Sequence, residues 1–307
     1  MRKSSTKNPK TAAHPSADAE KSNAAKQGRG TLYLVPTPIG NLSDMTFRAV
    51  EVLKSVATIA CEDTRTSRIL LQHYGITTPC ISYHTHNEAK SIETLVAQLV
   101  AGQSLGLISD AGTPLISDPG ARLVSAAIAA DIPVVPLPGA CAIPTALAGS
   151  GLGGGSFFFG GFVPTQAGER EAFLRDMLCK PYAVILYETP HRLRASMAAL
   201  AEIEPTRHVV LAAELSKRFE RWVRGTASDV LTQLGAGEIK GEWVMVIAPA
   251  AAEAQSSDAL VDAMLEEALN RLSAPKAAAE VARATHRPRA EVYNRILALK
   301  HGKHPTP

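Results

Sequence analysis

Short apolar runs alternate with segments of helical periodicity from residue 32 to residue 137, and this alternation constrains the fold more than any other feature. The runs predict strands at 32–35, 56–60, 80–83, 105–108 and 132–137. Between them, one helix is predicted over 46–54, two end near 74 and 100, and one begins at Pro119. Five such strand-helix units predict a mainly parallel sheet with helices on both faces.

The loop after the fourth predicted strand carries the strongest indication of a binding site. It contains a carboxylate, a glycine and a hydroxyl, at Asp110, Gly112 and Thr113. Ligands of open parallel sheets bind beyond the carboxyl ends of the strands, so this loop predicts a small-molecule site. An ordinary strand-to-helix turn is the alternative on this loop alone. Further polar clusters follow other strands, at 36–41, 61–65 and 84–88.

The second half of the chain predicts a sheet of a different kind. Apolar runs at 157–162, 182–187, 208–212, 221–225 and 242–248 predict five strands, with helices over 168–178 and from Pro190. The last three strands lack regular helical crossovers, which favours a mixed sheet. A glycine-rich segment at 149–156 contains G-x-G-x-x-G, but it follows a predicted helix and not a strand. We interpret it as a connection between domains.

From Asp258 onward the sequence is helical. Apolar side chains keep helical spacing over 261–272, a second helix is predicted over 276–284, and a turn at 285–288 leads into a third. The last two helices resemble a helix-turn-helix and bear basic side chains. This favours contact with nucleic acid, although such helical pairs also occur without it.

Charge is distributed unevenly behind the net value of +3. Residues 1–30 and 276–303 each carry a net +5, which leaves −7 for the body between them. Basic ends indicate that a polyanion is held there, but for residues 1–30 we favour a solvated, disordered basic tail. No segment approaches the roughly eighteen apolar residues of a membrane span. The four separated cysteines suit free buried thiols, so we expect a cytoplasmic protein.

Seven motifs accompany the predicted strand ends. They are PTPIGNL (36–42), CEDTR (61–65), HTHNE (84–88), SDAGTPLISDPG (109–120), PLPGACA (136–142), YETPHR (187–192) and AELSK (213–217). In this order they resemble the ribosomal RNA small-subunit methyltransferase I family of the tetrapyrrole methylase superfamily. The resemblance covers residues 31–301. Two positions depart from the family pattern, Ala140 in place of the usual proline and Ala213 in place of the usual arginine.

The resemblance implies an α/β fold of two domains with a C-terminal helical module. We expect the N-terminal domain over 31–148, with a parallel sheet, and the second over 149–252, with a mixed sheet. A module at 258–301 is expected to contact RNA. The implied activity is 2′-O-methylation of a cytidine in the decoding region of 16S rRNA, within the small ribosomal subunit. The implied methyl donor is S-adenosylmethionine, no metal is implied, and the implied assembly is a homodimer.

Site residues follow from the resemblance by position. Three loops are expected to bind the cofactor, through Pro38, Gly40, Asn41, Asp110, Ala111, Gly112, Thr113, Pro138, Gly139 and Ala142. A ribose hydroxyl is a poor nucleophile while protonated, so a base is expected. The candidates are Glu62, Asp63 and His84, and nothing in the sequence ranks them. Contacts to RNA are expected from Arg65, His191, Arg192, Lys217, Lys276, Arg289 and Arg295.

Two other functions compete with this interpretation. A tetrapyrrole-type methylase of the same superfamily would act on a small molecule, but those enzymes share a G-x-G-x-G pattern in the first loop. This chain has Thr37, Pro38, Ile39, Gly40 and Asn41 there. A ribosome-associated RNA-binding protein without catalysis would also explain the basic ends, and it would bind no cofactor.

Overall fold

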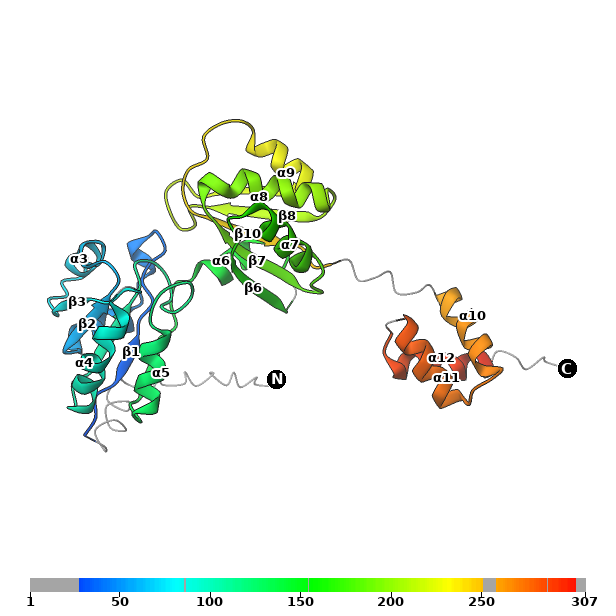
Figure 1. Ribbon diagram of the computed structural model, residues 1–307, viewed down its shortest axis with the longest axis horizontal. Coiled ribbons are helices and arrows are strands. Elements are labelled where there is room, and N and C mark those ends of the chain that lie inside the picture. Colours follow the sequence, from blue (N-terminus) through cyan, green and yellow to red (C-terminus); the bar gives the residue numbers. More distant parts are fainter. Residues whose placement is uncertain (1–27, 86, 154, 251–257, 286, 302–307) are drawn as a thin grey trace, which may run out of the picture.

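A computed structural model describes residues 28–85, 87–153, 155–250, 258–285 and 287–301. Figure 1 shows two α/β domains joined near helix α6 (Ala142–Ser150), followed by a unit of helices. The predicted fold class is therefore confirmed. All but the last three residues of the predicted basic tail lie outside the described residues. Across those described ranges, none of the helices has both the length and the apolar character needed to span a membrane.

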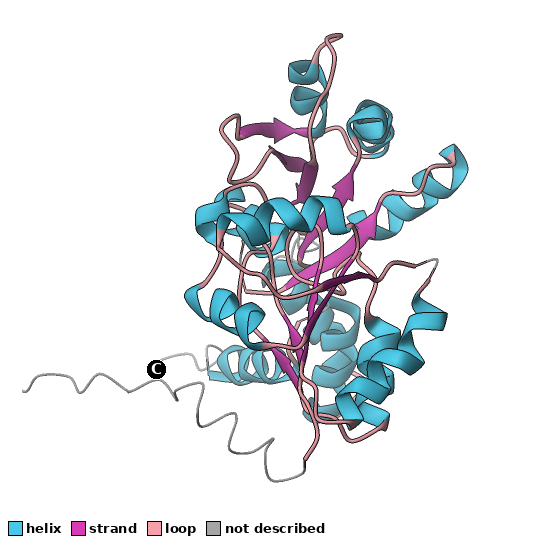
Figure 2. Ribbon diagram, turned by 90° about the vertical axis from the view of Figure 1, so that its left-hand side faces the viewer, coloured by secondary structure: helices cyan, strands magenta, loops and turns pink. Residues whose placement is uncertain are grey.

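The first sheet has the strand order β3-β2-β4-β1-β5, and all neighbours are parallel, as predicted. Its strands are β1 (Leu32–Leu34), β2 (Thr58–Cys61), β3 (Cys80–Ser82), β4 (Leu105–Ile108) and β5 (Val134–Pro136). The accompanying helices are η1 (Leu42–Asp44), α2 (Phe47–Ser55), α3 (Thr64–His73), α4 (Glu88–Val100) and α5 (Ala121–Ala129). Figure 2 shows the strands enclosed by helices.

Both faces of the first sheet are covered by apolar side chains. Helix α2 contributes Val52 and Leu53 to one cluster, and α4 contributes Leu95 and Leu99 to the other. Burying each large apolar side chain contributes roughly 1.5–3 kcal/mol. All four residues of the central strand β4 are buried between these layers. The loop that follows β4 therefore starts from a rigid position.

Helix α5 begins two residues later than the sequence predicts. The prediction started it at Pro119, but the structure starts it at Ala121. Gly120 has a φ of +133°, which is outside the helical region and which a residue with a Cβ rarely adopts. A Cβ at this position would also lie 2.7 Å from Leu107 Cδ2. The extra residues lengthen the loop after β4.

The second sheet has the order β6-β7-β10-β8-β9. Its strands are β6 (Phe157–Phe162), β7 (Ala183–Glu188), β8 (His208–Ala213), β9 (Arg221–Thr226) and β10 (Trp243–Ile247). Only the β6–β7 pair is parallel, so the predicted mixed sheet is confirmed. Helices α7 (Ala167–Leu178) and α8 (Pro190–Ile203) follow β6 and β7.

One helix of the second domain escaped the sequence analysis. Helix α9 (Ala227–Leu234) connects β9 to β10, so the expectation that the last three strands lack helical crossovers is wrong for this connection. Thr226 and Asp229 form a capping box at its start, in which each side chain accepts a hydrogen bond from the other's backbone N–H. Val230 and Leu234 turn its apolar face toward the sheet. The helical pattern of this segment was present in the sequence, but it spans only eight residues.

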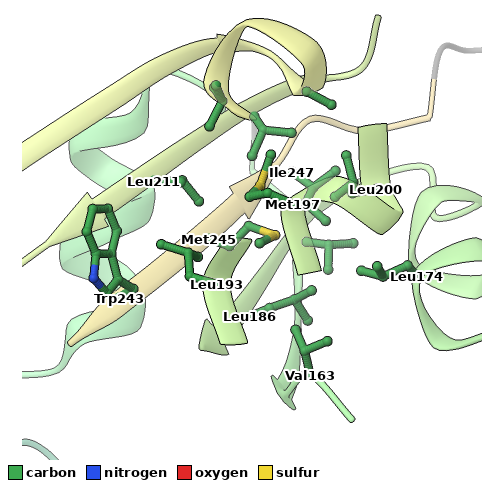
Figure 3. Packing of buried hydrophobic residues seen from close by; sticks show 14 of the residues in the cluster. Val163, Leu174, Leu186, Leu193, Met197, Leu200, Leu211, Trp243, Met245 and Ile247 are labelled. Atoms are coloured by element: carbon green, nitrogen blue, oxygen red, sulfur yellow. The ribbon is translucent and has the colours of Figure 1, made fainter. Parts of the chain in front are cut away.

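The core of the second domain lies between its sheet and helices α7, α8 and α9. Figure 3 shows Leu193, Met197 and Leu200 of α8 beside Leu186, Leu211 and Met245 from the strands. Trp243, at the start of β10, closes one end of this cluster and is almost fully buried. Its indole N–H donates to the Lys240 carbonyl at 2.9 Å, which satisfies its polar atom.

Helix α6 covers the other face of the second sheet. Its residues Ile143 and Ala146 belong to a cluster with Ile185 and Val244. Gly149 lies so close to the indole of Trp222 that a Cβ there would meet it at 2.4 Å. Residue 148, where we expected the N-terminal domain to end, therefore lies inside a helix that packs on the second sheet.

The carboxyl-terminal unit consists of α10 (Asp258–Leu269), α11 (Ala274–Thr285) and α12 (Arg289–His301). Val261, Leu265, Val281 and Ile296 form its buried cluster. The three helices pack on one another, as their apolar spacing predicts.

The cysteines are free thiols, but they are not all buried. Cys61 is buried, Cys80 and Cys141 are half-buried, and Cys179 is exposed. The prediction of four buried thiols is therefore wrong in part. Cys179 follows the last residue of α7, beyond the apolar face that packs on the sheet.

Candidate functional site

A cavity of ≈ 380 Å³ lies between the two domains. The first domain contributes Ile39 after β1, residues 110–113 and 116–118 after β4, and Cys141 and Ala142 after β5. From the second domain come Phe162, residues 187–190, Leu215 and residues 242–244. The cavity therefore lies where the strands of the parallel sheet end, which is the expected location of a ligand site in such a fold.

The loop after β4 is fixed by hydrogen bonds to the loop after β1. Thr37 and Gly112 exchange two backbone hydrogen bonds of 2.9 Å each. The Thr37 hydroxyl donates to the Ser109 carbonyl at 3.0 Å, and the Ser109 hydroxyl donates to the Gly112 carbonyl at 3.0 Å. Thr113 extends the network to the loop after β5, because its hydroxyl donates to the Ala140 carbonyl at 3.0 Å. Three loops thus form one preorganised wall.

Several residues of this wall have unusual backbone conformations. Gly112 has a φ of +83°, and a Cβ there would meet Ile39 at 3.4 Å. Leu115 and Ser117 also have positive φ, at 74° and 67°. Residues with side chains are strained in this region, and such strain is concentrated at binding and catalytic sites. The strained segment presents Asp118 to the cavity.

About half of the predicted cofactor residues line the cavity. Those that do are Asp110, Ala111, Gly112, Thr113 and Ala142, whereas Pro38, Gly40, Asn41, Pro138 and Gly139 are not among the lining residues. Gly40 and Gly139 instead allow close packing. A Cβ on Gly40 would meet Lys217 Cγ at 2.2 Å, and one on Gly139 would meet Pro36 Cβ at 2.6 Å.

The carboxylates of the first domain raise one another's pKa. Burial and the nearby carboxylate of Glu62 raise the pKa of Asp118 to about 6, although a hydrogen bond with Ser109 opposes the shift. Burial and Asp110 likewise raise the pKa of Glu62. Like charges held close together disfavour ionisation, which explains both shifts. Negative charge is therefore concentrated beside the cavity.

The three predicted bases do not line the cavity, although they lie near its acidic wall. Asp63 caps α3, accepting from the Arg65 backbone N–H at 2.8 Å and from its guanidinium at 2.8 Å. The Arg65 side chain holds the pKa of Asp63 at about 2. The backbone N–H of Asp63 donates to Asp110 at 3.2 Å, and that of His84 donates to Asn87 at 2.8 Å. Glu62 acts on the site electrostatically, because its carboxylate helps to raise the pKa of Asp118.

The second domain presents carboxylates that are held by partners. Glu188 has a fully buried side chain, 2.9 Å from Arg192 Nη2. It also accepts from the Ser196 hydroxyl at 2.5 Å and from the Thr189 backbone N–H at 2.7 Å. A buried carboxylate with three donors is a structural anchor as well as a part of the cavity wall.

The AELSK segment connects the domains across the cavity. Lys217 Nζ lies 3.0 Å from Glu214 and 2.9 Å from Glu242. The backbone N–H of Glu242 and Lys217 lower the pKa of Glu214. Ser216 donates to Asp44 of the first domain. The stem of Lys217 meanwhile lies against Gly40, so this segment packs on the first loop.

The predicted RNA-contacting residues come from three parts of the fold. Arg65, His191, Lys276 and Arg289 are exposed. Arg192 and Lys217 take part in the ion pairs described above, and Arg295 binds Asp262 of α10 through two contacts of 2.5 and 2.9 Å. Those three side chains have structural partners; among the exposed four, Arg65 also binds Asp63 and Arg289 donates to the Pro275 carbonyl.

Sequence reasoning missed four residues of the cavity that carry chemistry or shape. They are Asp118, Phe162, Tyr187 and Trp243. Asp118 and Tyr187 belong to the SDAGTPLISDPG and YETPHR motifs, so proximity to a motif was an available signal. Phe162 and Trp243 sit at ends of apolar strands and carry no such signal. Burial raises the pKa of Tyr187, so its hydroxyl stays protonated.

Comparison with known proteins agrees with this geometry. Residues 31–231 match the family Tetrapyrrole (Corrin/Porphyrin) Methylases, and residues 253–300 match the RsmI C-terminal HTH domain. Uroporphyrin-III C-methyltransferase from Thermus thermophilus, solved in complex with S-adenyl homocysteine, has a similar fold. It superposes with a TM-score of 0.52 at 18% identity, covering 71% of this chain and 97% of that one. The fold and the cavity define a methyltransferase of the tetrapyrrole methylase class.

Closer relatives specify the family. A Ribosomal RNA small subunit methyltransferase I from Streptococcus pyogenes serotype M1 is 47% identical over 236 residues, which are 77% of this chain and 82% of the relative. The protein of the same name from Mesorhizobium japonicum is 44% identical over 271 residues, which are 88% of this chain and 92% of the relative. The chain belongs to the ribosomal RNA small subunit methyltransferase I family within the tetrapyrrole methylases.

Proposed function

We propose that this protein methylates the ribose 2′-hydroxyl of a cytidine in the decoding region of 16S rRNA, within the small ribosomal subunit. The methyl donor is S-adenosylmethionine. Membership of the family supports rRNA as the substrate, because the relatives are named for it. The observation that carries the proposal is the interdomain cavity, with an acidic wall on the first domain and an apolar surface beside it.

The residues of the cavity fit S-adenosylmethionine. The cavity volume of ≈ 380 Å³ is within the usual range for small-molecule sites. Asp110 suits the ammonium, and the backbone groups of the wall suit the adenine edge and the ribose. Ile39, Ile116 and Leu215 provide apolar surface for a flat ring. The polar and apolar groups thus correspond to the chemistry of the donor.

Transfer needs orientation more than bond activation from the protein. When bound, S-adenosylmethionine supplies a methyl group that its positive sulfur already activates. The preorganised wall of Thr37, Gly112 and Thr113 holds one side of the site in place before any ligand binds. The second domain lines the other side with apolar side chains, among them Leu215 and Val244.

Asp118 is our candidate for the group that accepts the proton of the ribose hydroxyl. It lines the cavity, whereas Glu62, Asp63 and His84 do not. Its pKa of about 6 leaves it ionised at neutral pH yet more basic than an ordinary carboxylate. Asp63 is less basic, because Arg65 holds its pKa at about 2. Glu62 would act on Asp118 through its charge.

The helical module is our candidate for anchoring the RNA. Lys276 and Arg289 are exposed on α11 and α12, while the body of the chain is acidic. Phosphate contacts release counterions, so binding through this module should weaken steeply with salt. A homodimer and a cytoplasmic location remain predictions from the resemblance and the composition.

Methylation mapping tests the proposal directly. Small subunits from a strain that lacks the protein are incubated with the purified chain and S-adenosylmethionine, and ribose methylation of 16S rRNA is mapped. One new 2′-O-methyl group on a cytidine in the decoding region is expected. A methyl group on a base, or none, would refute the assigned chemistry.

The proton acceptor is tested by Asp118→Asn. We expect the transfer rate at pH 7.5 to fall about 100-fold, within the range for loss of a general base, with S-adenosylmethionine affinity changed less than about threefold. The wild-type rate should rise with pH through about 6, because Asp118 accepts a proton only when ionised. Equal losses of affinity and rate would make Asp118 a cofactor ligand instead. As a control, Glu62→Gln retains Asp118 but removes the neighbouring carboxylate that helps to raise its pKa.

A further inference from the structure

The segment that contributes Leu215 to the cavity wall continues to an exposed aromatic side chain. Phe219 is 76% exposed, at the end of the segment that contains the cavity residue Leu215. The guanidinium of Arg218 lies over its ring, 5.6 Å from the centroid. Other large apolar side chains of this protein are also exposed, Phe47 among them, so the case for Phe219 depends on its surroundings and not on its exposure alone.

The segment below Phe219 is held firmly. Glu214 and Ser216 have positive φ, at 52° and 65°, a strained conformation for residues with side chains. The Glu220 carboxylate accepts from the Ser216 backbone N–H at 2.8 Å and from the Trp222 indole N–H at 2.9 Å. Lys217 binds two carboxylates on either side. Phe219 is therefore presented by a preorganised turn.

Basic and aromatic side chains continue from this turn along β9, the edge strand of the second sheet. Residues 217–224 contain four basic side chains and one acid. The guanidinium of Arg221 lies 4.9 Å from the ring centroid of Trp243, and that of Arg224 lies 4.7 Å from that of Trp222. Arg218, Arg221 and Arg224 are exposed, so their charges face solvent. Residues 218–224 are called the β9 edge below.

We propose that Phe219, with Arg218 over its ring, stacks on an unpaired base of the substrate RNA next to the methylated nucleotide, while Arg221, which lies over the ring of the cavity residue Trp243, contacts a flanking phosphate. Proteins recognise single-stranded RNA by stacking its bases on aromatic rings and guanidinium planes. The positive charge of the β9 edge matches a polyanion and disfavours a basic or purely apolar partner. The inference rests on the proposed function and assigns a substrate contact to it.

Phe219→Ala tests the stacking contact. Loss of one stacked base should raise the KM for the small subunit about tenfold to 100-fold, leave kcat within about twofold and leave S-adenosylmethionine affinity unchanged. Phe219→Trp should retain the wild-type KM, since it keeps an aromatic face. Phe157→Ala is the matched control, because Phe157 is also exposed but lies at the opposite end of β6 from the cavity residue Phe162.

Three results would overturn the inference, and each is distinguishable from failure of the proposed function. If wild-type protein methylates the subunit and Phe219→Ala has the same KM, the ring does not bind RNA. If the KM rises equally in Phe157→Ala, the effect is not local. If Phe219→Ala converts a dimer into monomers in light scattering, the β9 edge is a contact between copies of this chain. Only failure of the wild-type protein to methylate the subunit would challenge the proposed function itself.

Discussion

The carboxylates in and beside the two walls of the cavity differ in their pKa values and in their partners. On the first domain, Glu62 and Asp118 have raised pKa values, because burial and neighbouring like charges disfavour their ionised forms. On the second, Glu188 is bound by Arg192, and the pKa of Glu214 is lowered by hydrogen bonds from the Glu242 backbone and Lys217. The carboxylates of the first domain are therefore unfavourable when ionised, whereas those of the second domain are stabilised by cations and hydrogen-bond donors.

This difference separates the roles of the two domains. Carboxyl groups with a raised pKa reduce the stability of the folded chain at neutral pH, which suggests that they are retained for function. Carboxylates with bound cations and donors stabilise the wall that they belong to. We therefore expect substitutions on the first wall to change ligand binding and chemistry, and substitutions on the second wall to change stability.

The largest effect is expected for Glu188→Ala on the second wall. The substitution leaves the half-buried Arg192 and the buried Ser196 hydroxyl without their acceptor, so the free energy of unfolding should fall by about 3 kcal/mol. Urea unfolding followed by circular dichroism measures it. Glu171→Ala is the control, because Glu171 pairs with Arg175 on the exposed surface of α7, and its loss should be below about 0.5 kcal/mol. Equal changes in both variants would contradict the anchoring role of Glu188.

Gly112→Val on the first wall should mainly affect the ligand. Its β-branched side chain is strained at a φ of +83° and would point toward Ile39, so S-adenosylmethionine affinity should fall at least about 100-fold, equivalent to about 2.7 kcal/mol. Calorimetry with the folded variant measures the loss. Gly75→Val has a similar backbone strain at a φ of +60°, but nothing lies within 4 Å of its Cβ, so it should bind the cofactor normally. Normal binding by Gly112→Val would remove this loop from the site.

Asp118→Asn removes an unfavourable charge from the first wall, so we expect it to stabilise the protein. The folded pKa of about 6 exceeds the ordinary value of 3.8, so the folded protein retains a proton that the unfolded chain releases between these values. Stability is therefore lost as the pH rises through that interval, and asparagine avoids the loss. We expect equal stabilities near pH 3.5 and a variant that is more stable by about 1–2 kcal/mol at pH 7.5. A destabilised variant at pH 7.5 would show that the charge of Asp118 is satisfied in the folded protein.

Lys217→Met should have the smallest effect. Methionine keeps an apolar stem over Gly40 but removes the ion pairs with Glu214 and Glu242, so about 0.5–1 kcal/mol of stability should be lost. The loss should shrink at high salt, because the pairs are partly exposed. Thermal unfolding at two salt concentrations checks this. A loss that does not depend on salt would indicate packing and not charge as the cause.

Sequence patterns predicted the first domain well because its strands are buried on both faces. The run 105–108 is fully apolar, and the structure buries all four residues as β4. In the second domain, α9 was missed, because eight residues between two strands provide little periodicity. The capping box at Thr226 and Asp229 was its clearest local signal.

The candidate site was predicted in part. Asp110, Gly112 and Thr113 were expected at the end of β4, and they line the cavity because the carboxyl ends of parallel strands share one edge. Asp118 was left out of the predicted site, and Asp110, the other acid of its motif, was chosen. Its position depends on positive φ at Leu115 and Ser117, and such strain is held by surrounding structure that no local pattern reveals.

Periodicity and short motifs are local properties of the chain, so they were enough to predict the strands, all of the long helices, the parallel first sheet, the mixed second sheet and the family, but not the short helix α9. Which acids face the cavity and which are bound by cations depends on the tertiary structure and could not be predicted from local patterns. Glu62 and Asp118 are 56 residues apart in the sequence, and Lys217 and Glu242 are 25 apart. Their charges interact because two sheets and a strained loop bring them together, and electrostatic energy depends on distance and burial, not on separation along the chain.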